Sequence, residues 1–261
     1  MAITFTGVAK TGIILGNDAV LQNLFSIENG ISSRVNINIH TLKVGVDIVG
    51  VLTAVTPILR ISRATSISGG QLVEKVGFDT SQTSDPAVNF RVPDMESARI
   101  TATPGTTIWE QFINRMHTAV EQQQPVNPVE ILPAICGNTG NTVILHPGEN
   151  LLVQLVAAAG TSNPAVNNNY YVKVLFDEDS LSTFAISGTV TLNGVGLTGA
   201  KVMVIEADDI NLTNAFLRDV ITTPAGGAWS STIRTGKVGA AFVQYNTGGT
   251  YYTAAGSPFL S

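Results

Sequence analysis

The side chains most able to do chemistry are three histidines and a single cysteine. His40, His117 and His146 lie far apart, and none has the HExxH or Cys-His spacing of a zinc site. Cys136 has no neighbouring motif that would activate a thiol, and it cannot form a disulfide within the chain. We therefore expect exposed or hydrogen-bonded histidines and a packed thiol.

Two acidic groups could hold a cation. Asp177-Glu178-Asp179 and Asp208-Asp209 both lack the alternating ligands of a twelve-residue EF-hand loop. The simpler interpretation is that these are solvated carboxylates in a linker and at a strand end. A weak Ca²⁺ site at a domain junction is the alternative.

Two further motifs fail on their context. The segment 194–199 matches GxGxxG, but predicted strands flank it and no helix follows, so a dinucleotide site is not expected. Asn211-Leu212-Thr213 is a glycosylation sequon only in a secreted eukaryotic protein, and no Gly-x-Ser-x-Gly elbow occurs. We assign no catalytic, cofactor-binding or metal-binding residue, and we expect a protein that is not an enzyme and uses no cofactor.

The composition excludes several classes of protein. Of the 261 residues, 44% are hydrophobic and only 13% are charged, about half the usual charged share of a globular domain. The net charge of -5 gives no reason to bind nucleic acid or an anionic membrane, and no apolar window is long enough to span a bilayer. Met1–Thr6 alternates like a strand and lacks the features of a signal peptide, so synthesis in a reducing cytoplasm is expected.

The elements that must position these residues are mostly short strands. Val35, Ile37 and Ile39 alternate strictly with polar residues, which is typical of a half-buried strand. Further strands are predicted at 44–52, 58–64, 72–78, 88–92, 142–145, 151–157 and 170–176, with turn residues between them. This spacing favours an antiparallel β-sandwich. Ile3–Val8 could be its first strand or could pair with a neighbouring chain.

One segment predicts a helix. Thr107 and Glu110 form a capping-box pattern, and Phe112 and Met116 follow at helical spacing. We expect one amphipathic helix over Ile108–Gln123, laid against the sandwich. Its tryptophan and methionine could form a ligand-binding stripe, although core packing is favoured.

The chain divides in two at a polar break. Strand-like alternation stops around Asp179–Thr183 and resumes with a different rhythm, which predicts domains at 1–182 and 183–261. The second domain contains predicted strands at 186–192, 200–207, 228–233, 239–245 and 251–254.

The C-terminal domain resembles the Ig-like domains of the carboxypeptidase regulatory-like family. Gly199-Ala200-Lys201-Val202 and the segment 223–229, which ends in a tryptophan, carry the match, with Pro224 in place of the usual acidic residue. The resemblance covers about 75 residues. It implies a small Ig-like β-sandwich of a kind used as a spacer, an adhesin or a surface decoration.

The N-terminal domain resembles virion proteins of tailed phages. The similar stretches are LFSIENGISSRVNINIHTL, ISRATSISGGQLVEKVGFDT and LHPGENLLVQL, and the Pro-Gly-Glu of the last resembles a strand opening in jelly-roll-like sandwiches. The whole chain thus resembles a capsid cement or decoration protein, which has no catalytic residues. The resemblance implies a place on the capsid surface of the virion, synthesis in the host bacterium, binding to the major capsid protein and self-association, with a trimer expected at three-fold lattice positions.

Three other functions remain open. The protein could be a tail, baseplate or head-fibre component. It could be a carbohydrate-binding adhesive module, with Trp229, Tyr245, Tyr251 and Tyr252 stacking on sugar rings, although their alternation along predicted strands favours core packing. A jelly-roll hydrolase would need convergent carboxylates or histidines. The cement protein is the leading hypothesis.

Overall fold

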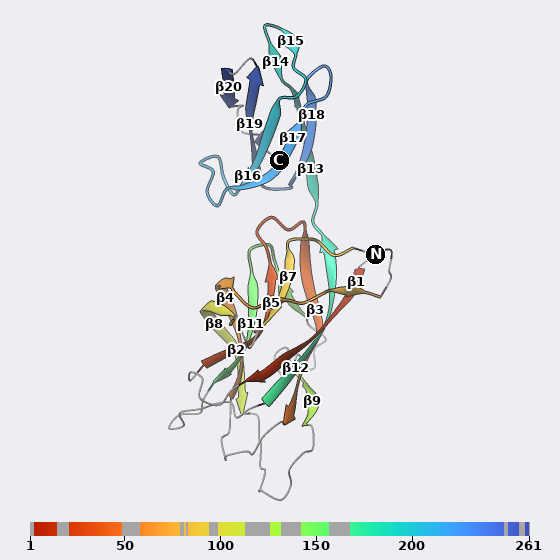
Figure 1. Ribbon diagram of the computed structural model, residues 1–261, viewed down its shortest axis with the longest axis vertical. Coiled ribbons are helices and arrows are strands. Elements are labelled where there is room, and N and C mark those ends of the chain that lie inside the picture. Colours follow the sequence, from red (N-terminus) through yellow and green to blue (C-terminus); the bar gives the residue numbers. More distant parts are fainter. Residues whose placement is uncertain are drawn as a thin grey trace, which may run out of the picture. The chain divides into compact units, whose positions relative to one another are not determined.

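The computed structural model shows two compact units, Met1–Asp179 (unit 1) and Ser180–Ser261 (unit 2). It describes residues 3–14, 21–48, 58–78, 81, 83–93, 99–112, 126–131, 142–156, 168–247, 250–255 and 259–260. All regular structure in this part of the chain is β-strand, and no described residue is helical. The mainly β class predicted from the sequence is confirmed (Figure 1).

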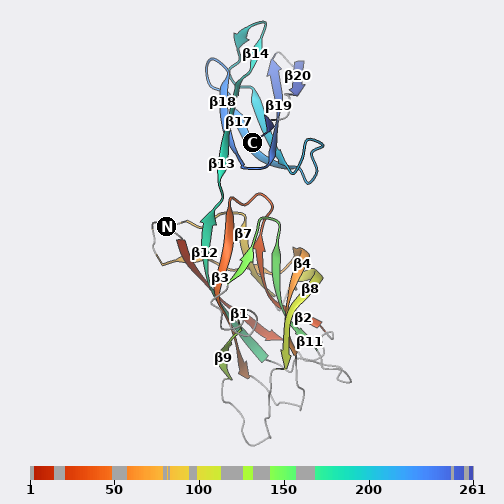
Figure 2. The same cartoon turned by 180° about the vertical axis from the view of Figure 1, so that it is seen from behind.

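One sheet of unit 1 has the order β10-β3-β12-β1-β6, with β9 also paired to β3. Phe5 on β1 lies opposite Phe176 on β12, in antiparallel register (Figure 2). The N-terminal strand therefore belongs to its own sandwich. The strands are β1 (Ile3–Ile14), β3 (Val35–Ile48), β6 (Val76–Gly77), β9 (Val126–Glu130), β10 (Val143–Leu145) and β12 (Asn168–Ser180).

The second sheet of unit 1 has the order β5-β7-β2-β11-β4-β8. Its outermost long strand, β8, pairs with β4 in a register that shifts at three places along its length. The strands are β2 (Leu21–Asn29), β4 (Ile58–Ser68), β5 (Gln71–Leu72), β7 (Val88–Val92), β8 (Thr101–Phe112) and β11 (Asn150–Val156).

Aromatic side chains fill the core between the two sheets. The rings of Phe5 and Phe176 stack with centroids 5.4 Å apart, and Phe90 meets Phe176 edge-on at 4.9 Å. Gly7 makes room for this group, because a Cβ there would lie 2.7 Å from the ring of Phe90. The predicted alternation on β3 is also confirmed, since Val35 and its alternate neighbours Ile37 and Ile39 are buried.

The predicted helix is wrong where it can be compared. Residues 108–112 belong to β8, and the remaining residues, 113–123, lie outside the described part of the chain. Trp109 pairs with Ile61 on β4 and packs on the core. The Glu110 carboxylate accepts a hydrogen bond from Arg60 Nε at 2.7 Å and does not cap a helix. The β-branched and aromatic residues of 101–112 favour an extended chain, and pairing with β4 outweighs the capping pattern.

Unit 2 is a small sandwich around its own core. One sheet is β13 with β18, a larger one has the order β17-β16-β19-β20, with β21 also paired to β19, and β14 and β15 form a separate two-stranded sheet. The core includes Val202, Val204, Trp229 and Ile233. The strands are β13 (Thr183–Thr189), β14 (Thr191–Leu192), β15 (Val195–Gly196), β16 (Lys201–Ala207), β17 (Phe216–Thr222), β18 (Ala228–Arg234), β19 (Val238–Thr247), β20 (Thr250–Ala255) and β21 (Phe259–Leu260).

Candidate functional site

The histidines that the structure describes make separate hydrogen bonds. His40 Nε2 lies 2.7 Å from Asp177 Oδ2, and His146 Nδ1 lies 3.0 Å from Asn36 Oδ1. Within the described ranges, no three His, Cys, Asp or Glu side chains are grouped so that they could hold a metal ion. Two candidates, His117 and Cys136, lie outside these ranges.

The first acidic group is not a solvated linker, which corrects the sequence-based expectation. Asp177, Glu178 and Asp179 lie within β12, where side chains alternate between the two faces of the sheet. Asp177 and Asp179 contact His40 and Asn38 on the outer face. Glu178 points inward and is 3% exposed.

The second acidic group stabilises a loop after β16. Asp208 accepts a hydrogen bond from Lys237 Nζ at 2.7 Å and another from Asn214 at 2.8 Å. Asp209 accepts bonds from the backbone N–H groups of Asn211 and Thr213. These bonds lower the pKa of both carboxyls. Neither is grouped with other metal-ligating side chains in this part of the structure.

The glycine-rich segment 194–199 begins in the hairpin turn between β14 and β15 and continues through β15. Asn193 and Gly194 have φ angles of 53° and 80°, as a tight two-residue turn requires. A Cβ at Gly196 would collide with the backbone of Gly226, so the glycine allows two backbones to touch. β15 follows the turn directly, and this context does not suit a dinucleotide phosphate.

The aromatic residues considered for sugar binding do not form one platform. Trp229 is buried in the core of unit 2, and Tyr245 packs against that core. Tyr252 is exposed. The side chain of Tyr251 lies outside the described part.

The most distinctive surface is a segment that joins the two sheets of unit 1, Gln71–Phe78, here called the bridging segment. Leu72 on β5 pairs with Arg91 at the edge of one sheet. Val76 on β6 then pairs with Thr6 at the edge of the other sheet. The predicted strand over 72–78 therefore exists only as these two short pieces.

The bridging segment reverses the usual distribution of side chains. Leu72, Val76 and Phe78 are 58%, 53% and 66% exposed. Lys75, the basic residue among them, turns inward, where Nζ donates to the carbonyl oxygen of Asp85 at 3.0 Å and to that of Val88. Such a reversal is unusual because burying a charge has a desolvation cost.

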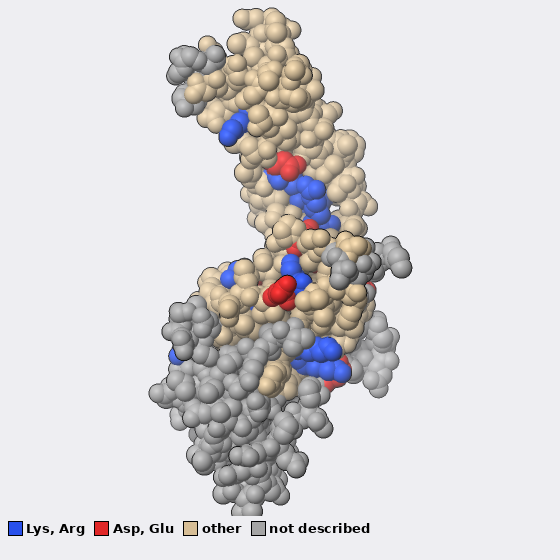
Figure 3. Space-filling view, turned by 45° about the vertical axis from the view of Figure 1, so that its right-hand side comes forward, with Lys and Arg blue, Asp and Glu red and all other residues tan. Residues whose placement is uncertain are grey.

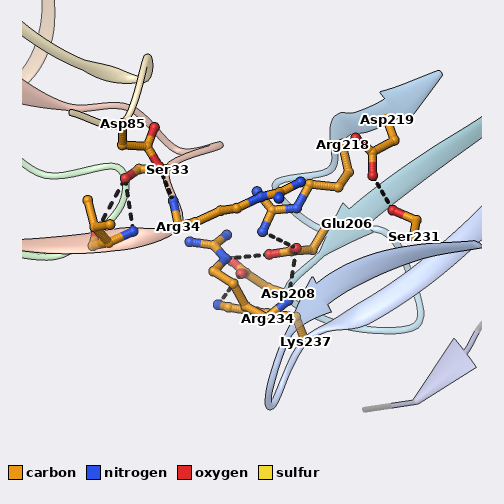
Figure 4. A network of polar contacts seen from close by, with 11 residues as sticks. Ser33, Arg34, Asp85, Glu206, Asp208, Arg218, Asp219, Ser231, Arg234 and Lys237 are labelled. Atoms are coloured by element: carbon orange, nitrogen blue, oxygen red, sulfur yellow. Dashed lines mark hydrogen bonds and ion pairs between the residues drawn. The ribbon is translucent and has the colours of Figure 1, made fainter. Parts of the chain in front are cut away.

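A polar cluster beneath the segment holds it in place. The Glu178 carboxylate accepts hydrogen bonds from the Ser84 hydroxyl and, at 2.8 Å, from the Asp85 N–H. The Asp85 carboxylate accepts a bond from the Arg34 N–H at 2.9 Å (Figure 4). Burial raises the pKa of Glu178 and lowers that of Lys75. The cluster thus fixes a segment on which Leu72, Val76 and Phe78 are exposed, together with Glu74.

The alternating sequence around Lys75 leaves two arrangements open. In an extended chain, Val73 and Lys75 share one face, and Leu72, Glu74 and Val76 share the other. The sequence pattern alone does not decide which of these faces points outward. Val73 packs against the core, and this contact decides the outcome.

Comparison with known proteins identifies no relative. No family model matches the chain, and no curated protein or solved structure is similar to it. In the part of the chain that the structure describes, no helix is long and apolar enough to cross a membrane.

Proposed function

We propose that the protein is a non-enzymatic structural protein of a tailed-phage virion that binds and stabilises the capsid as a cement or decoration protein. Its partners are the major capsid protein and further copies of itself, with a trimer as the expected state. The bridging segment carries the proposal, because its three exposed apolar side chains lie on a segment fixed from beneath. It also falls within one of the stretches that resemble virion proteins.

The composition supports binding through apolar and hydrogen-bonded contacts. Interface cores are poor in charged residues, and only 13% of this chain is charged. Figure 3 shows a face on which few Lys, Arg, Asp and Glu side chains interrupt the other described residues. In the proposed arrangement unit 1 faces the shell. Unit 2, whose sequence resembles Ig-like surface domains, faces outward.

A protein that binds only the assembled shell stabilises it by mass action. The test is to mix the full chain with undecorated capsids and to measure binding over a salt series, together with the heat tolerance of the particles. Binding should survive moderate salt, because few ion pairs are available to be screened.

The bridging segment can be tested in the same assay. Phe78→Asp should abolish binding to capsids, since it places a charge in the proposed apolar contact. Phe184→Asp changes an exposed phenylalanine of unit 2 and is the matched control, which should bind like the wild type. Absence of wild-type binding, or binding with no gain in heat tolerance, would reject the cement protein in favour of a tail or fibre component.

A further inference from the structure

The larger sheet of unit 2 also has charged residues inside and apolar residues outside. Val202 and Val204 on β16 point into the core, so the alternate residues Met203 and Ile205 lie on the outer face. Glu206 has the same orientation as the two valines and is fully buried. Antiparallel strands with one solvated face usually carry polar residues outward, but Met203 and Ile205 on the outer face of β16 are apolar.

The outer residues form two apolar rows across three strands. Met203 is paired with Val220 on β17 and with Phe242 on β19. Ile205 is paired with Leu217 on β17 in the next row. Val220 and Leu217 are 52% and 53% exposed, and the other three are partly exposed. These five residues are called the outer apolar face.

The charges of the edge strand β17 are engaged away from this face. Arg218 Nη2 lies 3.0 Å from Glu206 Oε2, and the Asp219 carboxylate accepts a hydrogen bond from the Ser231 hydroxyl (Figure 4). Arg234 on β18 also pairs with Glu206. The guanidinium carbons of Arg218 and Arg234 lie 5.6 and 5.4 Å from the ring centre of Phe216. The rows are thus left free of charge.

We infer that the outer apolar face is a self-association site, at which two copies of this chain pack sheet against sheet. Two sheets stack about 10 Å apart when their facing side chains interdigitate. A two-fold axis parallel to β16 places Val220 of one copy opposite Phe242 of the other, and so sets a small side chain against a large one. Met203 then meets its own symmetry mate, and methionine adapts well to such a contact.

The residues around the face suit a contact between identical surfaces. The next row along the strands contains Thr222, Lys201 and Gln244, which form a polar rim beside the apolar rows. An isologous contact uses the same patch on both copies and needs no charge of opposite sign on a partner. An uncharged face meets that condition.

This inference is independent of capsid binding. A two-fold contact joins copies in pairs, so chains that also form a trimer through other surfaces would give a hexamer. The mass of the particle in solution therefore reports on the face directly.

The test uses the full chain at micromolar concentration and measures mass by light scattering. The wild type should contain an even number of copies. Val220→Asp should halve the mass, because it buries an unpaired charge in the contact. Val195→Asp is the matched control, since Val195 is 69% exposed on β15 of the same unit and lies outside the face. It should leave the mass unchanged.

Cross-linking provides a second measurement. In a Cys136→Ser background, a short bismaleimide reagent should cross-link Met203→Cys between copies, whereas it should not cross-link Val195→Cys. A monomeric wild type, or a mass that Val220→Asp leaves unchanged, would overturn the inference. If Val220→Asp instead abolishes capsid binding at constant mass, the face belongs to the shell contact and self-association is rejected.

Discussion

Each unit buries charged side chains beneath an apolar surface, and each of these side chains has polar partners. Lys75 and Glu178 lie under the bridging segment, and Glu206 and Arg234 lie under the outer apolar face. A buried ion that keeps its hydrogen bonds adds little to stability, but losing a partner is costly. These residues therefore determine which side chains face outward more than they stabilise the fold.

Glu178 should make the stability of unit 1 depend on pH. Burial raises the pKa of this carboxyl above its ordinary value of 4.5, so the folded chain binds the proton more tightly than the unfolded chain. Its stabilising contribution is complete below the ordinary value and is lost as pH rises through the raised pKa. Glu178→Gln cannot ionise. We expect its free energy of unfolding to rise relative to the wild type as pH increases above this ordinary value.

Urea unfolding followed by Trp109 fluorescence, in a Trp229→Phe background, measures this difference. Glu74→Gln, on the exposed side of the bridging segment, is the control and should change little with pH. A constant difference between Glu178→Gln and the wild type across the pH range would contradict the prediction.

Gly7 should not tolerate a side chain. A Cβ at this position would lie 2.7 Å from the Phe90 ring, so Gly7→Ala should lower the free energy of unfolding by about 1–3 kcal/mol through overpacking. Phe90→Leu removes the ring and should reduce the added cost of Gly7→Ala in the double variant. Strictly additive losses in thermal unfolding would show that the two residues do not compete for space.

At the scale of elements, Glu206 on β16 links β17 to β18, a strand of the other sheet, through Arg218 and Arg234. Glu206→Ala leaves two arginines without their shared carboxylate and should destabilise unit 2 by about 3–5 kcal/mol. Lys237→Ala breaks the exposed ion pair with Asp208 and should cost no more than about 1 kcal/mol. Trp229 fluorescence in a Trp109→Phe background follows unit 2. Equal losses for the two variants would contradict a special role for Glu206.

Strands with regular alternation could be predicted from the sequence, and irregular ones could not. β7 matches its predicted range, β11 is displaced by one residue, and β4 begins where predicted but extends to Ser68, because their apolar residues have a period of two or form a continuous run. β17 could not be predicted because Arg218 and Asp219 interrupt its apolar residues. Its pairing with β16 also shifts register between Val204 and Ile205 of β16. The helix was predicted because a capping pattern preceded apolar residues, and local pattern could not reveal the pairing with β4.

The bridging segment and the outer apolar face could not be predicted from the sequence for a related reason. A lysine or glutamate among apolar residues predicts an outward charge, since most charged side chains are solvated. Lys75 and Glu206 point inward only because partners distant in the sequence receive them, Asp85 and Val88 for the lysine and two arginines for the glutamate. Those partners become neighbours only in the folded chain.

At the scale of the whole molecule, each unit has its own core, so unit 2 should fold alone. A fragment of residues 180–261 should be soluble and rich in β-structure by circular dichroism, because its core closes within the unit. Its Trp229 unfolding midpoint should match that of the full chain with Trp109→Phe. An unfolded fragment would show that the core needs residues from outside the unit.

The register shifts in the pairing of β8 with β4 affect whether copies of the chain can add to one another edge to edge. A long exposed edge strand is a template on which further chains can add without limit, as in amyloid fibres. The three register shifts against β4, together with Pro104, which has no N–H to donate, make a regular ladder along this edge difficult. Strand addition at the β8 edge is thereby disfavoured relative to contacts between sheet faces, where symmetric contacts close. If the proposed coating of a capsid brings many copies close together, this edge would still offer a poor template for a filament.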